Sequence, residues 1–107
     1  MALNVAGFEW DEGNLDKCKK HGVTLAVVES LFQRALAVFP DPAHSEAEER
    51  FKAIGRSAGG RYVFVVFTVR RRDGETLIRP ISARYMHRKE VEHYAKEIAQ
   101  AAQRSGG

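Results

Sequence analysis

The sequence predicts an α+β fold, an antiparallel β-sheet with N-terminal helices and a C-terminal helix, in the order β-α-α-β-β-β-β-α. Apolar residues recur at helical spacing near both ends of the chain. Between these regions lie strand-like runs rich in β-branched and aromatic residues, joined by short links that favour antiparallel pairing. Because 107 residues are typical of one domain, we expect residues 1–107 to form a single domain.

The first strand and helix follow from local patterns. Phe8 and Trp10 alternate with an acidic residue, which predicts a short strand with one apolar face. Asn14 is the expected N-cap of a helix over residues 15–21. Gly22 then stands where a left-handed backbone ends a helix.

Further signals define the rest of the chain. Thr24 is the expected cap of a second helix that extends to about Arg34. The apolar run over residues 62–69 predicts a central strand buried on both faces. Asp73-Gly74 has the turn chemistry of a hairpin, and a last helix is expected over residues 87–103. The remaining strands are expected at residues 35–39, 50–54 and 76–84.

Charge is distributed unevenly along the chain. The net charge is +3, with −3 in residues 1–55 and +6 in residues 56–107. A basic half favours an anionic partner, with nucleic acid as the first candidate, although an unevenly charged solvated surface is the ordinary alternative.

Several protein classes do not fit the composition. No apolar run reaches the roughly 18 residues of a membrane span, and the N-terminus lacks the pattern of a secretory signal. Cys18 is the single cysteine, so it has no intrachain partner for a disulfide. The histidines show no metal-ligand spacing. We therefore expect a cytoplasmic protein with no membrane association, no metal and no cofactor.

The strongest cluster of chemically competent residues begins at the end of the last strand. Pro80 cannot donate a hydrogen bond to a sheet, which predicts either an edge strand or a bulge. Arg79 and Arg84 point to opposite faces of a regular strand, whereas a one-residue bulge at Pro80 turns both to the same face. We hypothesise that such a bulge aims two guanidinium groups into one site.

His87, Glu90 and Tyr94 form one stripe on the last helix. Together with the two arginines they could cleave RNA without a metal. Glu90 or His87 would take the proton of a ribose 2′-hydroxyl, the arginines would stabilise the phosphate, and His87 or Tyr94 would protonate the leaving oxygen. The alternative is structural, with Glu90 complementing the helix dipole, Tyr94 partly in the core and the arginines on the surface.

Other cations are candidate phosphate contacts. They lie at the tip of the predicted hairpin, at the end of the first helix and at the start of the last one. A soluble hairpin also commonly carries such charges, and cations near a helix C-terminus complement its dipole. The residues are Arg70, Arg71, Arg72, Lys20, His21 and Lys89.

A series of short motifs also occurs in a specific order between about residues 7 and 98. They are Phe8-Glu9-Trp10-Asp11, Lys20-His21-Gly22-Val23, Phe39-Pro40-Asp41-Pro42, Glu49-Arg50, Ile54-Gly55, Arg79-Pro80-Ile81-Ser82-Ala83-Arg84, Lys89-Glu90 and Tyr94. In this order and spacing they resemble the BrnT family of toxins from type II toxin–antitoxin systems.

The resemblance implies a fold similar to RelE and ParE toxins and a ribonuclease that inhibits translation. It implies an RNA substrate and a BrnA-like antitoxin, encoded nearby, that neutralises the toxin and carries the complex to promoter DNA. Matching by position supports Arg79, Arg84 and Glu90 as active-site residues, with Lys20 and His21 as motif positions. Two alternatives stay open: a toxin-fold module that binds antitoxin or nucleic acid with little or no cleavage, and a nucleic-acid binder without a toxin role.

Overall fold

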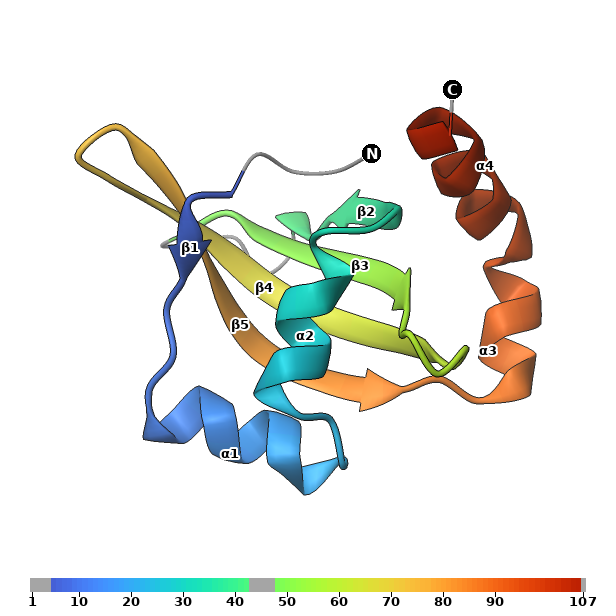
Figure 1. The fold of residues 1–107 in the computed structure, drawn as a ribbon, viewed down its shortest axis with the longest axis horizontal. Coiled ribbons are helices and arrows are strands. Elements are labelled where there is room, and N and C mark those ends of the chain that lie inside the picture. Colours follow the sequence, from blue (N-terminus) through green and yellow to red (C-terminus); the bar gives the residue numbers. More distant parts are fainter. Residues whose placement is uncertain (1–4, 43–47, 107) are drawn as a thin grey trace.

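A computed structural model describes residues 5–42 and 48–106 of the chain. Its framework is a five-stranded sheet with strand order β1-β5-β4-β3-β2 (Figure 1). The helices lie on both faces and at one end of this sheet. The strands are β1 (Gly7–Phe8), β2 (Leu36–Pro40), β3 (Arg50–Arg56), β4 (Tyr62–Arg72) and β5 (Glu75–Tyr85). The helices are α1 (Glu12–Lys20), α2 (Leu25–Leu31), α3 (Arg88–His93) and α4 (Ala95–Gly106).

The sheet is mixed, and the prediction of a wholly antiparallel sheet is wrong at its β1 edge. Strands β2 to β5 pair antiparallel in sequence order, as their short links predict. Strand β1 pairs parallel with β5, with Gly7 opposite Leu77 and Phe8 opposite Ile78. No hairpin joins β1 to β5, since two helices and three strands separate them along the chain. A turn therefore does not set their relative direction.

Strand β4 is central, as the apolar run predicts, but only one of its faces is fully buried and the other is mostly half-buried. Val65 and Phe67 belong to a core shared with α1 and α2. Phe64 belongs to a second core, which includes residues of α3 and α4. Alternate side chains of one strand therefore fill two separate apolar layers.

Strand β5 carries the predicted bulge at Pro80. Val66 of β4 lies opposite Ser82, but the next residue of β4, Phe67, lies opposite Pro80. Ile81 is the additional residue, so the alternation of side chains changes phase at this point.

Helix α1 begins earlier than predicted. Asp11 is its N-cap, and Asn14 is the third residue of the helix. The backbone N–H of Asn14 donates to Asp11 Oδ1 at 2.9 Å, and the backbone N–H of Asp11 donates to Asn14 Oδ1 at 2.7 Å. The prediction of Asn14 as N-cap is wrong because Asp11, three residues earlier, supplies the same type of cap.

The C-terminal helix is divided at Tyr94 into α3 and α4, where a single helix was predicted. The break is local, since Tyr94 N–H still donates to Glu90 and Ile98 N–H to Tyr94. The Tyr94 ring packs against Phe39 of β2, with ring centroids 5.7 Å apart. Within residues 5–42 and 48–106, the order is thus β-α-α-β-β-β-β-α-α, with one α-helix more than predicted.

Three shorter signals are confirmed. The Thr24 hydroxyl accepts a hydrogen bond from Val27 N–H at 3.2 Å and caps α2. Gly22 has a φ of 79° at the end of α1. Asp73 and Gly74 join β4 to β5 with φ values of 53° and 79°, as a tight hairpin turn requires.

Candidate active site

The bulge in β5 places Arg79 and Arg84 on the same face of the sheet. Arg79 lies opposite Thr68 of β4, and Arg84 lies opposite Phe64. Thr68 and Phe64 are four residues apart along β4, so their side chains share a face. The same spacing separates the two positions by about 13 Å along the strand.

Each of these arginines has its own carboxylate. Arg79 Nη2 donates to Asp11 Oδ2 at 2.6 Å, at the start of α1. Arg84 Nη1 and Nη2 donate to the two carboxylate oxygens of Glu90 in α3, each at 2.7 Å. The two guanidinium groups are thus held by different helices.

Glu90 is fully committed to hydrogen bonds that favour its ionised form. Besides the fork with Arg84, its Oε1 accepts a hydrogen bond from His87 N–H at 3.0 Å. The hydrogen bonds from Arg84 and then from His87 lower the pKa of Glu90 from 4.5 to about 2. A carboxylate with so low a pKa is a weak proton acceptor near neutral pH, but it orients Arg84 well.

A shallow pocket of about 420 Å³ brings together residues from three regions of the chain. His21 comes from the end of α1, Arg84 from β5 and His87 from the start of α3. All three are predicted site residues, although 63 positions separate His21 from Arg84. The remaining lining residues are Gly22, Arg61 and Tyr85.

Arg61 and Tyr85 are residues that the sequence pattern did not single out. The Arg61 guanidinium carbon lies 3.8 Å from the centroid of the Tyr85 ring, which is a cation–π contact. Arg61 precedes β4 and Tyr85 ends β5, so the antiparallel pairing of these strands brings them together. The antiparallel pairing of these strands was predicted. Arg61 and Tyr85 each lie one residue beyond the predicted strands, so continuing the pairing by one residue would have placed them close together.

Tyr94 and Arg79 do not line this pocket. The Tyr94 ring is packed between Phe39 and His93 in the second core. Tyr94 nonetheless contributes to the raised pKa of Arg84, after the larger effects of Glu90, so it is within electrostatic range of that guanidinium.

Two of the three hairpin arginines are engaged in ion pairs. Arg70 contacts Glu9 and Glu48, each at 2.8 Å, and Arg72 contacts Glu9 at 3.3 Å. Arg71 is exposed. The partly exposed hairpin therefore carries less free positive charge than its sequence predicts.

Lys20 and Lys89 are also exposed, one at the end of α1 and one in α3. Both lie close in sequence to a pocket residue. Lys20 directly precedes His21, and one residue separates Lys89 from His87. Long flexible lysine side chains at such positions can reach a phosphate that lies at the pocket rim.

Comparison with known proteins decides the family. A family model described as the ribonuclease toxin BrnT of type II toxin–antitoxin systems matches residues 10–90. The chain belongs to the BrnT family. No curated protein matches the chain. Membership in a type II family implies that the partner of the toxin is a protein antitoxin.

The match to the BrnT family contains the whole pocket. Its lining residues lie between His21 and His87, and Glu90 is the last matched residue. Strand β1 precedes the match and α4 follows it. The segment that carries the ribonuclease description is therefore also the segment that builds the pocket.

The described parts of this BrnT-family chain contain neither a cluster of metal-ligating side chains nor a membrane-spanning helix. Within residues 5–42 and 48–106, no three His, Cys, Asp or Glu side chains form a metal-binding group. No helix in those ranges has both the length and the apolar character needed to cross a membrane.

Proposed function

We propose that residues 1–107 act as one toxin domain, that this domain is cytoplasmic, and that it cleaves RNA by a reaction that needs no metal. The observation that supports this best is the pocket that gathers His21, Arg61, Arg84 and His87. Imidazole and guanidinium groups are the side chains that transfer protons and stabilise phosphate charge near neutral pH. The implied likeness to RelE and ParE toxins belongs to the same proposal.

The proposed reaction is attack of a ribose 2′-hydroxyl on the adjacent phosphate. One of His21 and His87 removes the hydroxyl proton, and the other gives a proton to the departing 5′-oxygen. The products are a 2′,3′-cyclic phosphate and a 5′-hydroxyl. No water and no metal-bound hydroxide is consumed in this step, so the proposal needs side chains alone.

Arg84 and Arg61 are the proposed phosphate ligands. Arg84 is 40% exposed in its side chain while it is paired with Glu90, so part of its guanidinium faces the pocket. Glu90 acts as a positioning residue that fixes this guanidinium. The Arg61 guanidinium rests on the Tyr85 ring, which orients it. Two oriented guanidinium groups suit the charge that develops on the phosphate.

The other predicted site residues have supporting roles in this proposal. Lys20 and Lys89 contact flanking phosphates, and so does Arg71 at the hairpin. Arg79, Arg70 and Arg72 mainly connect elements through their ion pairs. Tyr94 holds α3 against β2.

We also propose that the antitoxin is BrnA-like and that promoter DNA is bound only through the antitoxin. Growth arrest on expression of the chain, rescued by the product of the adjacent open reading frame, tests this partnership. Arrest without rescue contradicts it.

The first experiment uses purified chain and a defined RNA in excess EDTA. We expect cleavage with 5′-hydroxyl and cyclic-phosphate ends. Arg84→Ala and His87→Ala should each lower the rate about 10²–10³-fold, the usual cost of removing a transition-state donor. Arg88→Ala and His93→Ala are matched controls, because both residues are exposed and lie outside the pocket. RNA that is bound but not cut would favour the non-cleaving module instead.

A further inference from the structure

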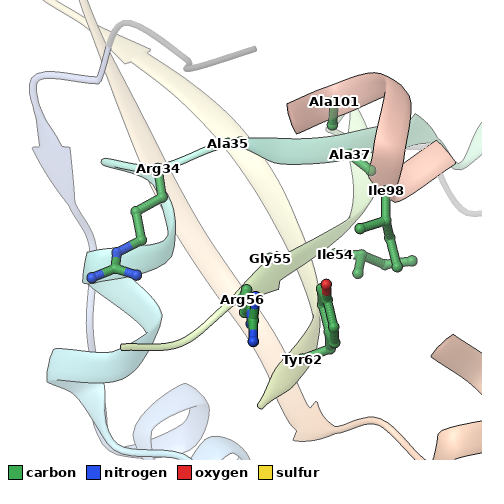
Figure 2. Close-up of a pocket in the computed structure, with 9 residues that line it drawn as sticks. All are labelled: Arg34, Ala35, Ala37, Ile54, Gly55, Arg56, Tyr62, Ile98 and Ala101. Carbon is green, nitrogen blue, oxygen red and sulfur yellow. The ribbon is translucent and has the colours of Figure 1, made fainter. Parts of the chain in front are cut away.

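A second pocket, of about 360 Å³, lies between α4 and the β2–β3 part of the sheet (Figure 2). Ile98 and Ala101 of α4 form one wall, and Ala37 of β2 and Ile54 of β3 form the other. Small and aliphatic side chains leave an apolar surface between helix and sheet. Such a surface binds an aliphatic or aromatic side chain well.

Two arginines stand at this pocket without acidic partners. Arg34 follows α2 and Arg56 ends β3, and neither has a carboxylate within ion-pair distance among the described residues. Arg56 is held in place, since its Nε donates to the Gly60 carbonyl at 3.2 Å and its guanidinium lies 5.7 Å from the Tyr62 ring. Six other arginines do pair with carboxylates, namely Arg50, Arg70, Arg72, Arg79, Arg84 and Arg88.

This contrast gives the pocket a defined chemistry. An apolar interior with two uncompensated positive charges is complementary to an apolar side chain next to a carboxylate. Apolar anchors that enter such pockets are frequent centres of protein–protein binding energy. An RNA strand would satisfy the arginines, but it would leave the aliphatic wall of Ala37, Ile54 and Ile98 without a matching group.

The pocket is distinct from the candidate active site but adjoins it. The two sets of lining residues have no member in common. They do contain consecutive residues, because Arg61 lines the candidate active site and Tyr62 lines the second pocket. The two pockets therefore meet along the chain at the start of β4. Helix α4, which forms one wall, lies beyond the family match.

We propose that the antitoxin docks here, inserting an apolar side chain between α4 and the sheet and placing a carboxylate against Arg34 and Arg56. The inference rests on the proposed antitoxin partnership and adds its site and its chemistry. From this anchor the partner extends across Arg61 and covers the candidate active site.

The test measures the affinity of the purified chain for the product of the adjacent open reading frame. Arg34→Glu/Arg56→Glu should weaken binding at least about tenfold, because it repels the partner carboxylate. Ala35→Trp should do the same by filling the pocket, which Ala35 also lines. Both variants should cleave RNA at the unmodified rate and escape inhibition by the partner.

The matched control is Lys19→Glu/Lys96→Glu. It changes the net charge by the same amount at two exposed cations outside the pocket, so affinity for the partner should stay within about twofold. Far-UV circular dichroism and thermal melting confirm that each variant is folded.

Several results overturn the inference. One is unchanged affinity and inhibition in both pocket variants, and another is loss of RNA binding rather than partner binding on charge reversal. Self-association of the free chain that Ala35→Trp abolishes would assign the pocket to a second copy. Failure of the unmodified chain to bind the adjacent product also overturns it. If the unmodified chain binds the partner but does not cleave RNA, the proposed ribonuclease activity is wrong. The docking proposal is then decided by the affinities of the two pocket variants for the partner.

Discussion

The fork between Arg84 and Glu90 ties a candidate phosphate ligand to a carboxylate whose pKa is about 2. Because the pKa of Glu90 in the folded chain is below its usual value of 4.5, the ionised form stabilises the fold. This stabilisation is complete above about pH 4.5. It is lost as the pH falls through about 2.

The Glu90→Gln variant tests this linkage. At neutral pH it should unfold at lower denaturant concentration than the unmodified chain, and the difference should shrink as the pH falls from about 4.5 toward 2. Urea unfolding at several pH values measures the difference. Glu92→Gln is the control, since Glu92 forms only an exposed pair with Arg88 and should show little such dependence. A pH-independent difference for Glu90→Gln would contradict the linkage.

The same residues show what the sequence could predict of the site. His21, Arg84 and His87 were all candidates by residue type and position, and the structure brings them to one pocket. Arg61 escaped notice because its role depends on contact with Tyr85 rather than on its sequence neighbours. The partners of Arg70 and Arg79 also depend on tertiary structure, since the acids that bind them lie far away in sequence.

At the scale of elements, Asn14 joins α1 to the bulge in β5. Asn14 is 4% exposed, and its side-chain amide donates to the Pro80 carbonyl at 2.8 Å and to the Glu9 carbonyl at 3.0 Å. The bulge therefore does two things. It turns the arginines of β5 to one face, and it presents a backbone carbonyl that fixes the helix leading to His21.

We expect Asn14→Ala to lower the free energy of unfolding by about 2 kcal/mol, since it removes the donor to the buried Pro80 carbonyl and to the partly buried Glu9 carbonyl. Asp16→Ala is the control, because Asp16 is exposed on the same helix and should change stability by less than about 0.5 kcal/mol. Chemical denaturation of the three proteins gives the comparison. Equal stabilities would show that the Asn14 amide is not a connection between α1 and β5.

Local signals predicted elements well where a single residue constrains the backbone. Pro80 lacks an N–H, Gly22 tolerates positive φ, and Asp73-Gly74 fits a tight turn. Features that depend on distant contacts were missed. The two residues of β1 are too few to predict whether it pairs parallel or antiparallel with β5. The helix break occurs at Tyr94, whose ring contacts Phe39 of the distant strand β2.

Across the whole molecule, the fold mixes the acidic and basic halves that the sequence keeps apart. Glu9 and Asp11 come from the acidic half, yet they bind arginines of the basic hairpin and of β5. Much of the basic surplus is thereby neutralised internally. Among the described residues, three of the four arginines without a carboxylate partner line the two pockets, with Arg61 at one and Arg34 and Arg56 at the other, and the fourth is the exposed Arg71 of the hairpin.

This distribution predicts how RNA affinity depends on salt. With the five proposed phosphate contacts, the slope of log affinity against log salt should be about −3.5 for single-stranded RNA. These contacts are Arg61, Arg84, Arg71, Lys20 and Lys89. Arg61→Ala should reduce its magnitude by about 0.7, the value for one phosphate contact. Filter binding at several salt concentrations, with a cleavage-deficient His87→Ala background, measures both slopes. A slope near zero would exclude phosphate contacts as the basis of binding.

The hydrogen bond from Asn14 to Pro80 spans 66 residues of the chain, and this separation has a consequence in time. At roughly 5–20 residues per second of synthesis, Asn14 leaves the ribosome about 3–13 s before Pro80 follows it. During that interval α1 has no β5 to hold it, and His21 has neither Arg84 nor His87 beside it. The nascent chain is thus without an assembled pocket until most of its length is made, which leaves time for a partner to be present when the last strand arrives.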